Sequence, residues 1–470
     1  MTKKWVITGT AIAGLMAYVT GPTRAQDDDQ GGLHLSLGVQ QSFSAGDNLA
    51  LGIPGSATNP EEGTTTLSTT NFALQLESAT RIQQFSFLLG GGLRYGSLPS
   101  GRSTETGFVD PQASIAYTRE GYSSRFTFSL DYNESDISQP RPLWDFSDDD
   151  EVIDPPSDLS GLRGSGQRQA YNSYLALTTG IGAPIGFRLT ANASGVRYEN
   201  ETVTTLDEFD RAQIGADTFF HFTPTTAAVL GLRFRRFDDN TATPARLSRG
   251  VDVGLDHEFA NQSDLSVRVG YTNADTTNVN QNGSAKGATG SVTYNKVMPN
   301  GTAFGNMSFR RTENGEISTI LGGRGYQLAN GRFRFSLGAS SVYGNSAKPI
   351  GGLGWQYQMP VSRIAVNISR RVIADGDDED RFTSTVAATY VQQLTAESNL
   401  FANLSYYLVD RTTNSTKVER TNLELGYQYE LTEDWNLDTG FSYRIRDEET
   451  VGQAESSAIF VSLSRRFDLF

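Results

Sequence analysis

From Leu33 to the C-terminus, apolar and polar residues alternate with a period of two in runs of about ten residues. One run places Phe126, Phe128, Leu130 and Tyr132 on one face, and Arg125, Thr127, Ser129 and Asp131 on the other. A tilted β-strand needs about ten residues to cross the apolar part of a bilayer. The pattern therefore predicts many strands that each have one apolar and one polar face.

The connections between these runs are alternately short and long. Short connections such as 180–184 and 223–226 carry turn residues, whereas long ones such as 44–70 and 134–169 are polar. Outer-membrane barrels have tight periplasmic turns and longer extracellular loops. The sequence thus predicts an all-β, transmembrane antiparallel up-and-down β-barrel of about 22 strands over residues 26–470, with about 18 to 20 strands also compatible.

Aromatic residues recur at both ends of the runs, where a membrane barrel places its interfacial belts. A soluble sheet protein would bury its aromatic residues in the middle of the strands instead. At the end that joins the long connections, the expected girdle includes Tyr95, Tyr132, Tyr198, Phe237, Tyr271, Tyr343 and Tyr443. At the other end it includes Tyr294, Tyr357 and Tyr390.

The first 25 residues have the features of a cleaved secretory signal peptide. Lys3 and Lys4 precede an apolar run over 6–19, and the segment 23–25 places small residues before a cleavage point at Gln26. A membrane-anchoring helix is the weaker alternative because the apolar run is short for a bilayer. The expected destination is therefore the outer membrane.

Composition narrows the chemistry. The chain has no Cys, only three His and a net charge of −14, which argues against thiolate sites, histidine-based catalysis and nucleic-acid binding. His34, His221 and His257 have no Ser or Asp constellation beside them in the pattern, so we expect no enzyme and no cofactor. Acidic runs at 148–151 and 375–380 match no calcium-binding loop spacing, and solvated loops explain them better than a metal site.

The polar faces carry arginines and acids on neighbouring strands. Cross-strand pairs of opposite charge would stabilise the sheet, and a charged lumen would also orient polar solutes, so a structural and a functional interpretation both remain open. The expected pore-lining residues are Arg94, Arg125, Arg188, Asp217, Arg233, Arg235, Asp252, Asp256, Arg268, Arg334, Glu424 and Arg444. In particular, we expect Arg233 and Arg235 to lie between Asp217 on the preceding strand and Asp252 and Asp256 on the following strand. We also expect Glu424 to face the strand that carries Arg444.

The last run, Ile459, Val461, Leu463, Arg465 and Phe467, is similar to the insertion signal read by the barrel-assembly machinery, although Phe470 is out of phase with it. With this signal and the strand meander, the chain resembles Gram-negative outer-membrane barrels of the porin class. More loosely, it resembles the porin-like barrels found with exopolysaccharide systems. The resemblance implies contacts with lipid and lipopolysaccharide. Because the first run begins at Leu33, we expect no plug domain of the kind that fills TonB-dependent siderophore receptors.

Two functions are compatible with this picture. The favoured one is a channel that passes hydrophilic solutes or exports a polysaccharide; the alternative is a closed structural or surface-adhesion barrel. A wide barrel needs a constriction, and the longest connection, 134–169, is the candidate. If it folds inward, Trp144 and Phe146 would line the constriction opposite Arg125 and Arg188, and Asp148, Asp149 and Asp150 would favour cations. A loop lying outside the membrane is the other possibility.

Overall fold

A computed structural model describes most of the chain as one β-barrel. The described residues are 32–49, 51–53, 63–97, 106–137, 162, 166–201, 206, 208–239, 245–275, 284–312, 315–374, 380–410 and 417–469. Among them, no helix has the length and apolar character needed to cross a membrane. The expected signal peptide, residues 1–25, and the chain up to residue 31 lie outside the described residues.

The described chain forms 22 strands. Their bounds are β1 Leu33–Asp47, β2 Thr64–Ala79, β3 Gln83–Ser97, β4 Gly107–Glu120, β5 Ser124–Asp136, β6 Gln167–Thr179, β7 Ile185–Glu199, β8 Phe209–Thr223, β9 Thr226–Asp238, β10 Arg246–Phe259, β11 Ser263–Asp275, β12 Ser284–Met298, β13 Gly301–Thr312, β14 Gly315–Leu328, β15 Gly331–Val342, β16 Lys348–Gln358, β17 Ser362–Ala374, β18 Asp380–Thr395, β19 Ser398–Val409, β20 Val418–Glu430, β21 Trp435–Glu448 and β22 Gly452–Asp468.

Each strand pairs antiparallel with the next, and β22 pairs with β1 to close the barrel. Phe467 lies opposite Leu37, and the Leu469 N–H donates to the Leu35 carbonyl oxygen (2.8 Å). The sequence prediction that the last strand would pair with the first near Leu35 and Leu37 is confirmed. The strand number agrees with the expected 22 rather than with 18 or 20.

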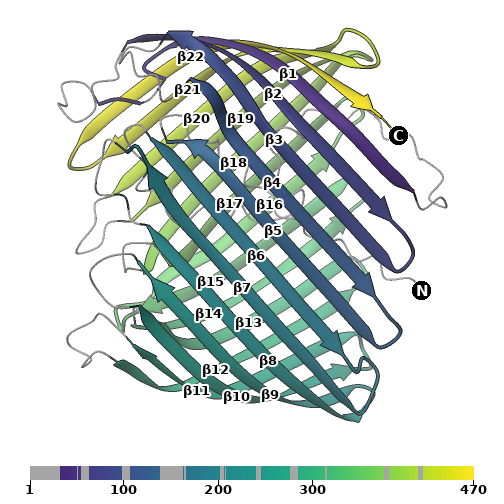
Figure 1. Cartoon of the computed structure of the whole chain (residues 1–470). Helices are drawn as coiled ribbons and strands as arrows, with labels where there is room; N and C mark the ends of the chain where they lie inside the picture. Colours follow the sequence, from purple (N-terminus) through teal and green to yellow (C-terminus); the bar gives the residue numbers. More distant parts are fainter. Residues whose placement is uncertain are drawn as a thin grey trace.

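The short turns gather at one end of the barrel, at the right in Figure 1, and we call this the turn end. Because the number of strands is even, β1 begins and β22 finishes at this end. The opposite end, which the long connections join, is the loop end. At the turn after β6, Gly180 has φ 72°, and a Cβ there would lie 2.4 Å from the Ile185 carbonyl oxygen. This tight turn therefore requires glycine.

The outer face of the barrel is apolar, as alternation along the strands predicts. Leu337, Ile459 and Val269 project from it with 72%, 63% and 60% of their surface exposed. Side chains this apolar and this exposed suit contact with lipid rather than water. The inner face carries the polar positions of the same strands.

The aromatic residues expected in the girdles do not all lie on the outer face. On the outer face lie Tyr95, Tyr132, Tyr271, Tyr294, Tyr357, Tyr390 and Tyr443. Tyr343, by contrast, has φ 54° and packs against the buried cluster that contains Ile317 and Ile350. The expectation is wrong for Tyr198 and Phe237, which are 6% and 2% exposed and lie inside the barrel. Phe237 has the same parity as Arg233, so the period of two already placed it on the inner face.

Candidate functional site: the occluded lumen

One charged network on the inner wall is centred on Arg233 of β9. Its Nη2 lies 2.6 Å from Asp217 Oδ1 on β8 and 3.8 Å from Asp252 Oδ1 on β10. Gly231, on the same strand as Arg233 and opposite both acids, leaves room for Asp252, because a Cβ there would lie 2.5 Å from its carboxylate. Arg233 therefore lies between the two acids that the sequence pattern placed beside it.

The network continues along the wall through a second pair. Arg268 of β11 donates from both Nη atoms to the Asp256 carboxylate of β10, at 2.7 and 2.8 Å. Arg188 of β7 stacks over the Phe219 ring at 5.3 Å. Partly exposed ion pairs of this kind contribute little each, about 0–1 kcal/mol, but together they form a polar wall on β7 to β11.

The remaining expected pore-lining arginines lie elsewhere on the wall. Arg334 stacks over Phe304 at 5.3 Å, and Arg235 lies opposite Gln213 and Ser248, closer to the loop end than Arg233. Arg125 lies at the turn end, where its Nη2 is 2.5 Å from Glu120. Arg188 is also near the turn end. Both Arg125 and Arg188 therefore lie far from the loop end, where the β5–β6 connection begins and ends. The loop acids that the prediction pairs with them, Asp148, Asp149 and Asp150, lie outside the described residues, so that pairing stays a prediction.

As expected, Glu424 of β20 faces β21, the strand that carries Arg444. Glu424 lies opposite Ser442, one inward position nearer the turn end than Arg444. Arg444 Nη2 donates instead to the Leu49 carbonyl oxygen (2.5 Å) and the Ser456 hydroxyl (3.4 Å). The prediction that these two strands are neighbours is therefore confirmed.

The loop end contains an apolar cluster inside the barrel, which we call the lid cluster. Its buried members are Ile137, Leu162, Val196, Tyr198, Phe209, Phe237, Ala387, Tyr407 and Val409. They belong to β7 to β9, to β18 and β19, and to the β5–β6 connection. The two groups of strands lie apart in the barrel, separated by β10 to β17 on one side and by β20 to β6 on the other. Apolar contact inside the lumen between such distant strands closes part of the opening.

Leu162 shows how the β5–β6 connection takes part in this closure. Its side chain is 6% exposed within the lid cluster, and its carbonyl oxygen accepts a hydrogen bond from Arg420 Nη2 (2.5 Å) on β20. The connection therefore reaches the inner wall far from β5 and β6. Trp144, Phe146, Asp148, Asp149 and Asp150, the expected constriction residues, lie outside the described residues.

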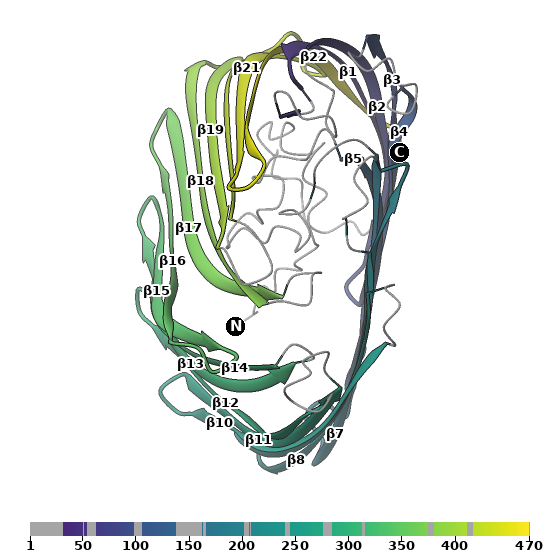
Figure 2. The same ribbon diagram turned by 90° about the vertical axis from the view of Figure 1, so that its left-hand side faces the viewer.

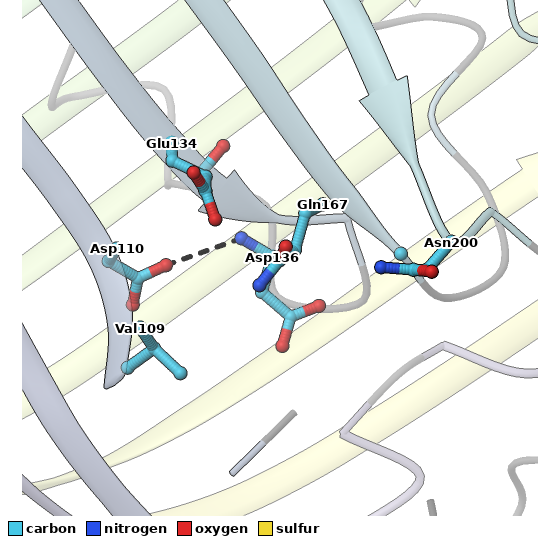
Figure 3. Close-up of a pocket in the computed structure, with 8 residues that line it drawn as sticks. Val109, Asp110, Glu134, Asp136, Gln167 and Asn200 are labelled. Carbon is cyan, nitrogen blue, oxygen red and sulfur yellow. Dashed lines mark hydrogen bonds between the residues drawn. The ribbon is translucent and has the colours of Figure 1, made fainter. Parts of the chain in front are cut away.

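A clamp of Arg94, Asp110 and Asp136 turns the start of this connection inward, and Figure 3 shows the two acids with the hydrogen bond between them. Arg94 of β3, 5% exposed, contacts Asp110 at 2.7 Å and Asp136 at 3.0 Å, and the Asp136 N–H donates to the Asp110 carboxylate (3.3 Å). Ile137 follows directly, its N–H donating to the Gly166 carbonyl oxygen (2.9 Å). Arg94 thus lines the lumen as a clamp on the connection rather than as a free pore cation.

A second segment, Asn48, Leu49 and residues 51–53, lies on the inner wall, and we call it the inner strap. Leu49 packs on Leu67 and Ala458, while Leu51 and Ile53 pack on Ala454. The Asn48 amide donates to the Gly52 carbonyl (2.8 Å) and to the Glu455 carbonyl of β22 (2.9 Å). The inner strap therefore covers the seam where β22 meets β1 and β21.

The strap was missed in the sequence, although its signal is visible there. Leu49, Leu51 and Ile53 form an apolar stretch inside an otherwise polar connection. Apolar residues in a long loop are costly in water unless they bury against something. The need to bury these three side chains therefore points to a position inside the lumen.

Figure 2 looks along the barrel from the loop end. The opening is oval, and the loop ends of β17 and β18 curve toward its middle. Phe382 of β18 packs against Ile317 of β14 and Ile350 of β16, strands that do not pair with β18. The strand ends thus narrow the lumen in addition to the strap and the lid cluster.

The histidines have local contacts. His221 stacks on Phe219 with ring centroids 6.4 Å apart, and His257 Nδ1 is 2.9 Å from the Thr226 hydroxyl. His34 Nε2 is 3.7 Å from Asp468. Among the described residues, no group of three acidic or histidine side chains is arranged to hold a metal ion.

Comparison of the whole structure places the fold in the outer-membrane β-barrel class. The ferric enterobactin receptor PfeA of Pseudomonas aeruginosa is 9% identical, with 93% of this chain and 82% of that chain covered and a TM-score of 0.51. The siderophore receptor PirA of Acinetobacter baumannii is 7% identical, with 93% of this chain and 81% of that chain covered and a TM-score of 0.51. The FrpB iron transporter of Neisseria meningitidis is 10% identical, with 92% of this chain and 81% of that chain covered and a TM-score of 0.50. No protein-family model and no curated protein sequence matches the chain.

These similarities correct the functional expectation. The barrels that this chain resembles are siderophore receptors and an iron transporter, not passive porins and not enzymes. The expected porin-like channel linked to exopolysaccharide, and its structural or adhesive alternative, are therefore withdrawn. The resemblance to the outer-membrane barrel class stands, whereas the looser one to exopolysaccharide porins finds no support.

Proposed function

We propose that the protein is an outer-membrane uptake receptor that admits one class of bulky polar ligand, such as a ferric siderophore, through a lumen that its own chain closes at rest. The observation that carries the proposal is Leu162, buried inside the barrel and bonded to β20. A general diffusion pore needs an open path for solutes. A lumen crossed by packed apolar side chains opens only when something displaces them.

The comparisons support the class of ligand. The solved barrels of this fold named above bind or transport siderophores and iron, and such ligands are too large and polar to cross a membrane unaided. The charged wall around Arg233 and Arg268 offers a polar lining to a ligand that has passed the lid cluster. Selective uptake therefore agrees with both the closed loop end and the hydrated interior.

The same proposal sets the orientation and assembly. The turn end faces the periplasm and the loop end faces outward, as in other barrels with short periplasmic turns. Export uses the signal peptide over residues 1–25, and the closing strand that ends near Phe467 engages the barrel-assembly machinery. The apolar outer face then contacts membrane lipid and lipopolysaccharide.

Ligand binding and permeation together test this function. The full chain, refolded in detergent, is titrated with ferric enterobactin, a ferric hydroxamate and a neutral oligosaccharide, and tryptophan fluorescence is followed. We expect saturable binding of a ferric chelate with a dissociation constant of about 1 μM or tighter. Liposomes that contain the protein should not swell in neutral sugars. Free passage of sugars without saturable binding of any chelate would contradict the proposal.

A further inference from the structure

The inner strap is a strained segment that tertiary contacts hold in place. Asn48 has φ 49° and Leu51 has φ 53°, in the left-handed region that leucine rarely adopts. The Leu51 N–H donates to the Asn48 carbonyl (3.0 Å) and the Gly52 N–H donates to the Asn48 Oδ1 (2.7 Å), forming one tight turn. Such strain persists only where the surroundings enforce it. The strap is therefore poised to change conformation once those contacts are lost.

Arg444 is the cation that binds this segment to the wall. It is partly buried on β21, and its guanidinium reaches the Leu49 carbonyl oxygen and the Ser456 hydroxyl. In the part of the chain that the structure describes, Arg444 makes no ion pair. A guanidinium that faces the lumen and bonds neutral oxygens has its charge uncompensated.

The surroundings of Arg444 are cationic. Arg420 and Arg446 lie directly opposite each other on β20 and β21, and Arg444 is the next inward residue on β21. Glu448 pairs with Arg446 at 2.7 Å. Together with Glu424, one inward position nearer the turn end on β20, these named side chains carry three positive charges against two negative charges. Such a site attracts an anion, particularly inside a narrow lumen where the field is poorly screened.

We propose that Arg444 is an anion-binding latch. An anionic group of the incoming ligand, such as a carboxylate, phosphate or deprotonated chelating oxygen, replaces the Leu49 carbonyl as the acceptor of the guanidinium. The loss of that hydrogen bond releases the inner strap. An anionic acceptor forms a stronger, often bidentate bond with arginine than a neutral carbonyl does. The strain at Leu51 assists the release. This inference rests on the proposed function, because it identifies the charge of the ligand and the segment that it moves.

The same geometry gives the strap two states. In one state Leu49, Leu51 and Ile53 cover the inner wall, and in the other they leave it and widen the lumen beside the seam. A ligand shifts such an equilibrium only by binding one state better than the other. Arg444 supplies that difference, since its anion site is free only after the Leu49 carbonyl has left.

Hydrogen exchange of the full-length barrel in detergent tests the latch, with inorganic phosphate as the probe and chloride at equal ionic strength as the reference. We expect exchange at Leu51 and Gly52 to accelerate as phosphate is added, and to saturate. In the Arg444→Gln variant the exchange should be about tenfold faster without phosphate, because a bond to a charged group is lost, and phosphate should change it no further. Arg125→Gln, at the exposed turn end, is the matched control and should behave like the wild type.

Three results would overturn the latch: strap exchange in the wild type that ignores phosphate, a phosphate response that survives in Arg444→Gln, or slow exchange in that variant. Heat-modifiable migration on gels verifies that each variant has folded, and the wild-type titration decides the matter even if Arg444→Gln does not fold. A phosphate response together with no uptake of any chelate would refute the proposed function and leave the latch standing. Chelate uptake with no phosphate response would refute the latch and leave the proposed function standing.

Discussion

Truncating Leu162 should open the barrel to reagents from outside. The side chain is 6% exposed inside the lid cluster, so Leu162→Ala removes buried contacts on which the closed state depends. Leucine-to-alanine changes at buried sites cost about 2–5 kcal/mol, and a connection that can relax belongs at the lower end. At about 1.4 kcal/mol per factor of ten, 2 kcal/mol raises the open population about 30-fold.

Because the chain contains no cysteine, the accessibility of a single introduced cysteine can be measured by thiol labelling. A single cysteine replaces Asn192, an inward residue midway along β7 and nearer the turn end than the lid cluster residue Val196. Whole cells are treated with a membrane-impermeant maleimide, whose labelling rate follows the open population when opening and closing are fast. We expect labelling about 30-fold faster with Leu162→Ala, and an even larger increase with Leu162→Asp.

The matched control is Leu177→Ala on β6, which removes the same atoms from the lipid-facing surface, where Leu177 is 37% exposed. It should leave the labelling rate at the parent value. If Leu162→Ala labels no faster than Leu177→Ala in protein that is folded by gel mobility, the lid cluster does not close the lumen. The reasoning from burial to occlusion would then be refuted.

Three further outcomes are expected. Arg94→Gln removes a buried guanidinium that pairs with both Asp110 and Asp136, so the protein should lose about 3–5 kcal/mol of stability in denaturant titrations, and an unchanged midpoint would contradict the role of Arg94 as a clamp. A double-mutant cycle of Arg233→Ala and Asp217→Ala should give a coupling of about 0.5–1 kcal/mol, since Arg233 is partly solvated, whereas strict additivity would argue against the pair. Deleting 456–470 should abolish heat-modifiable migration, because the barrel then has no closing strand; a truncated protein that still inserts would refute the strand pairing.

The sequence alone was sufficient for the barrel because one physical rule acts at every position of every strand. Membrane strands must hide all backbone polar groups and must face lipid on one side, so period-two alternation, tight turns and an even strand count follow locally. Phe467 opposite Leu37 is an example: both are apolar outward positions on strands that had to meet. Arg233 between its two acids is another, because neighbouring strands share a face.

The occlusion of the lumen could not be derived in this way. The parity of Tyr198 and Phe237 places both on the inner face, but the period of two does not show what their rings contact there. Their partners, Leu162 and Tyr407, lie on the β5–β6 connection and on β19. No local pattern connects positions so far apart in the chain.

What the sequence by itself determined about this protein is the set of properties that repeat along the chain: strand period, the identity of the two faces, the order of turns and connections, and closure of the last strand on the first. What only the tertiary structure decided is where the connections go once the wall exists. Leu49 meets Arg444, and Leu162 meets Arg420, through main-chain carbonyl oxygens that every residue possesses. Such contacts depend on the barrel's diameter and on strand register, which arise only when all strands have paired.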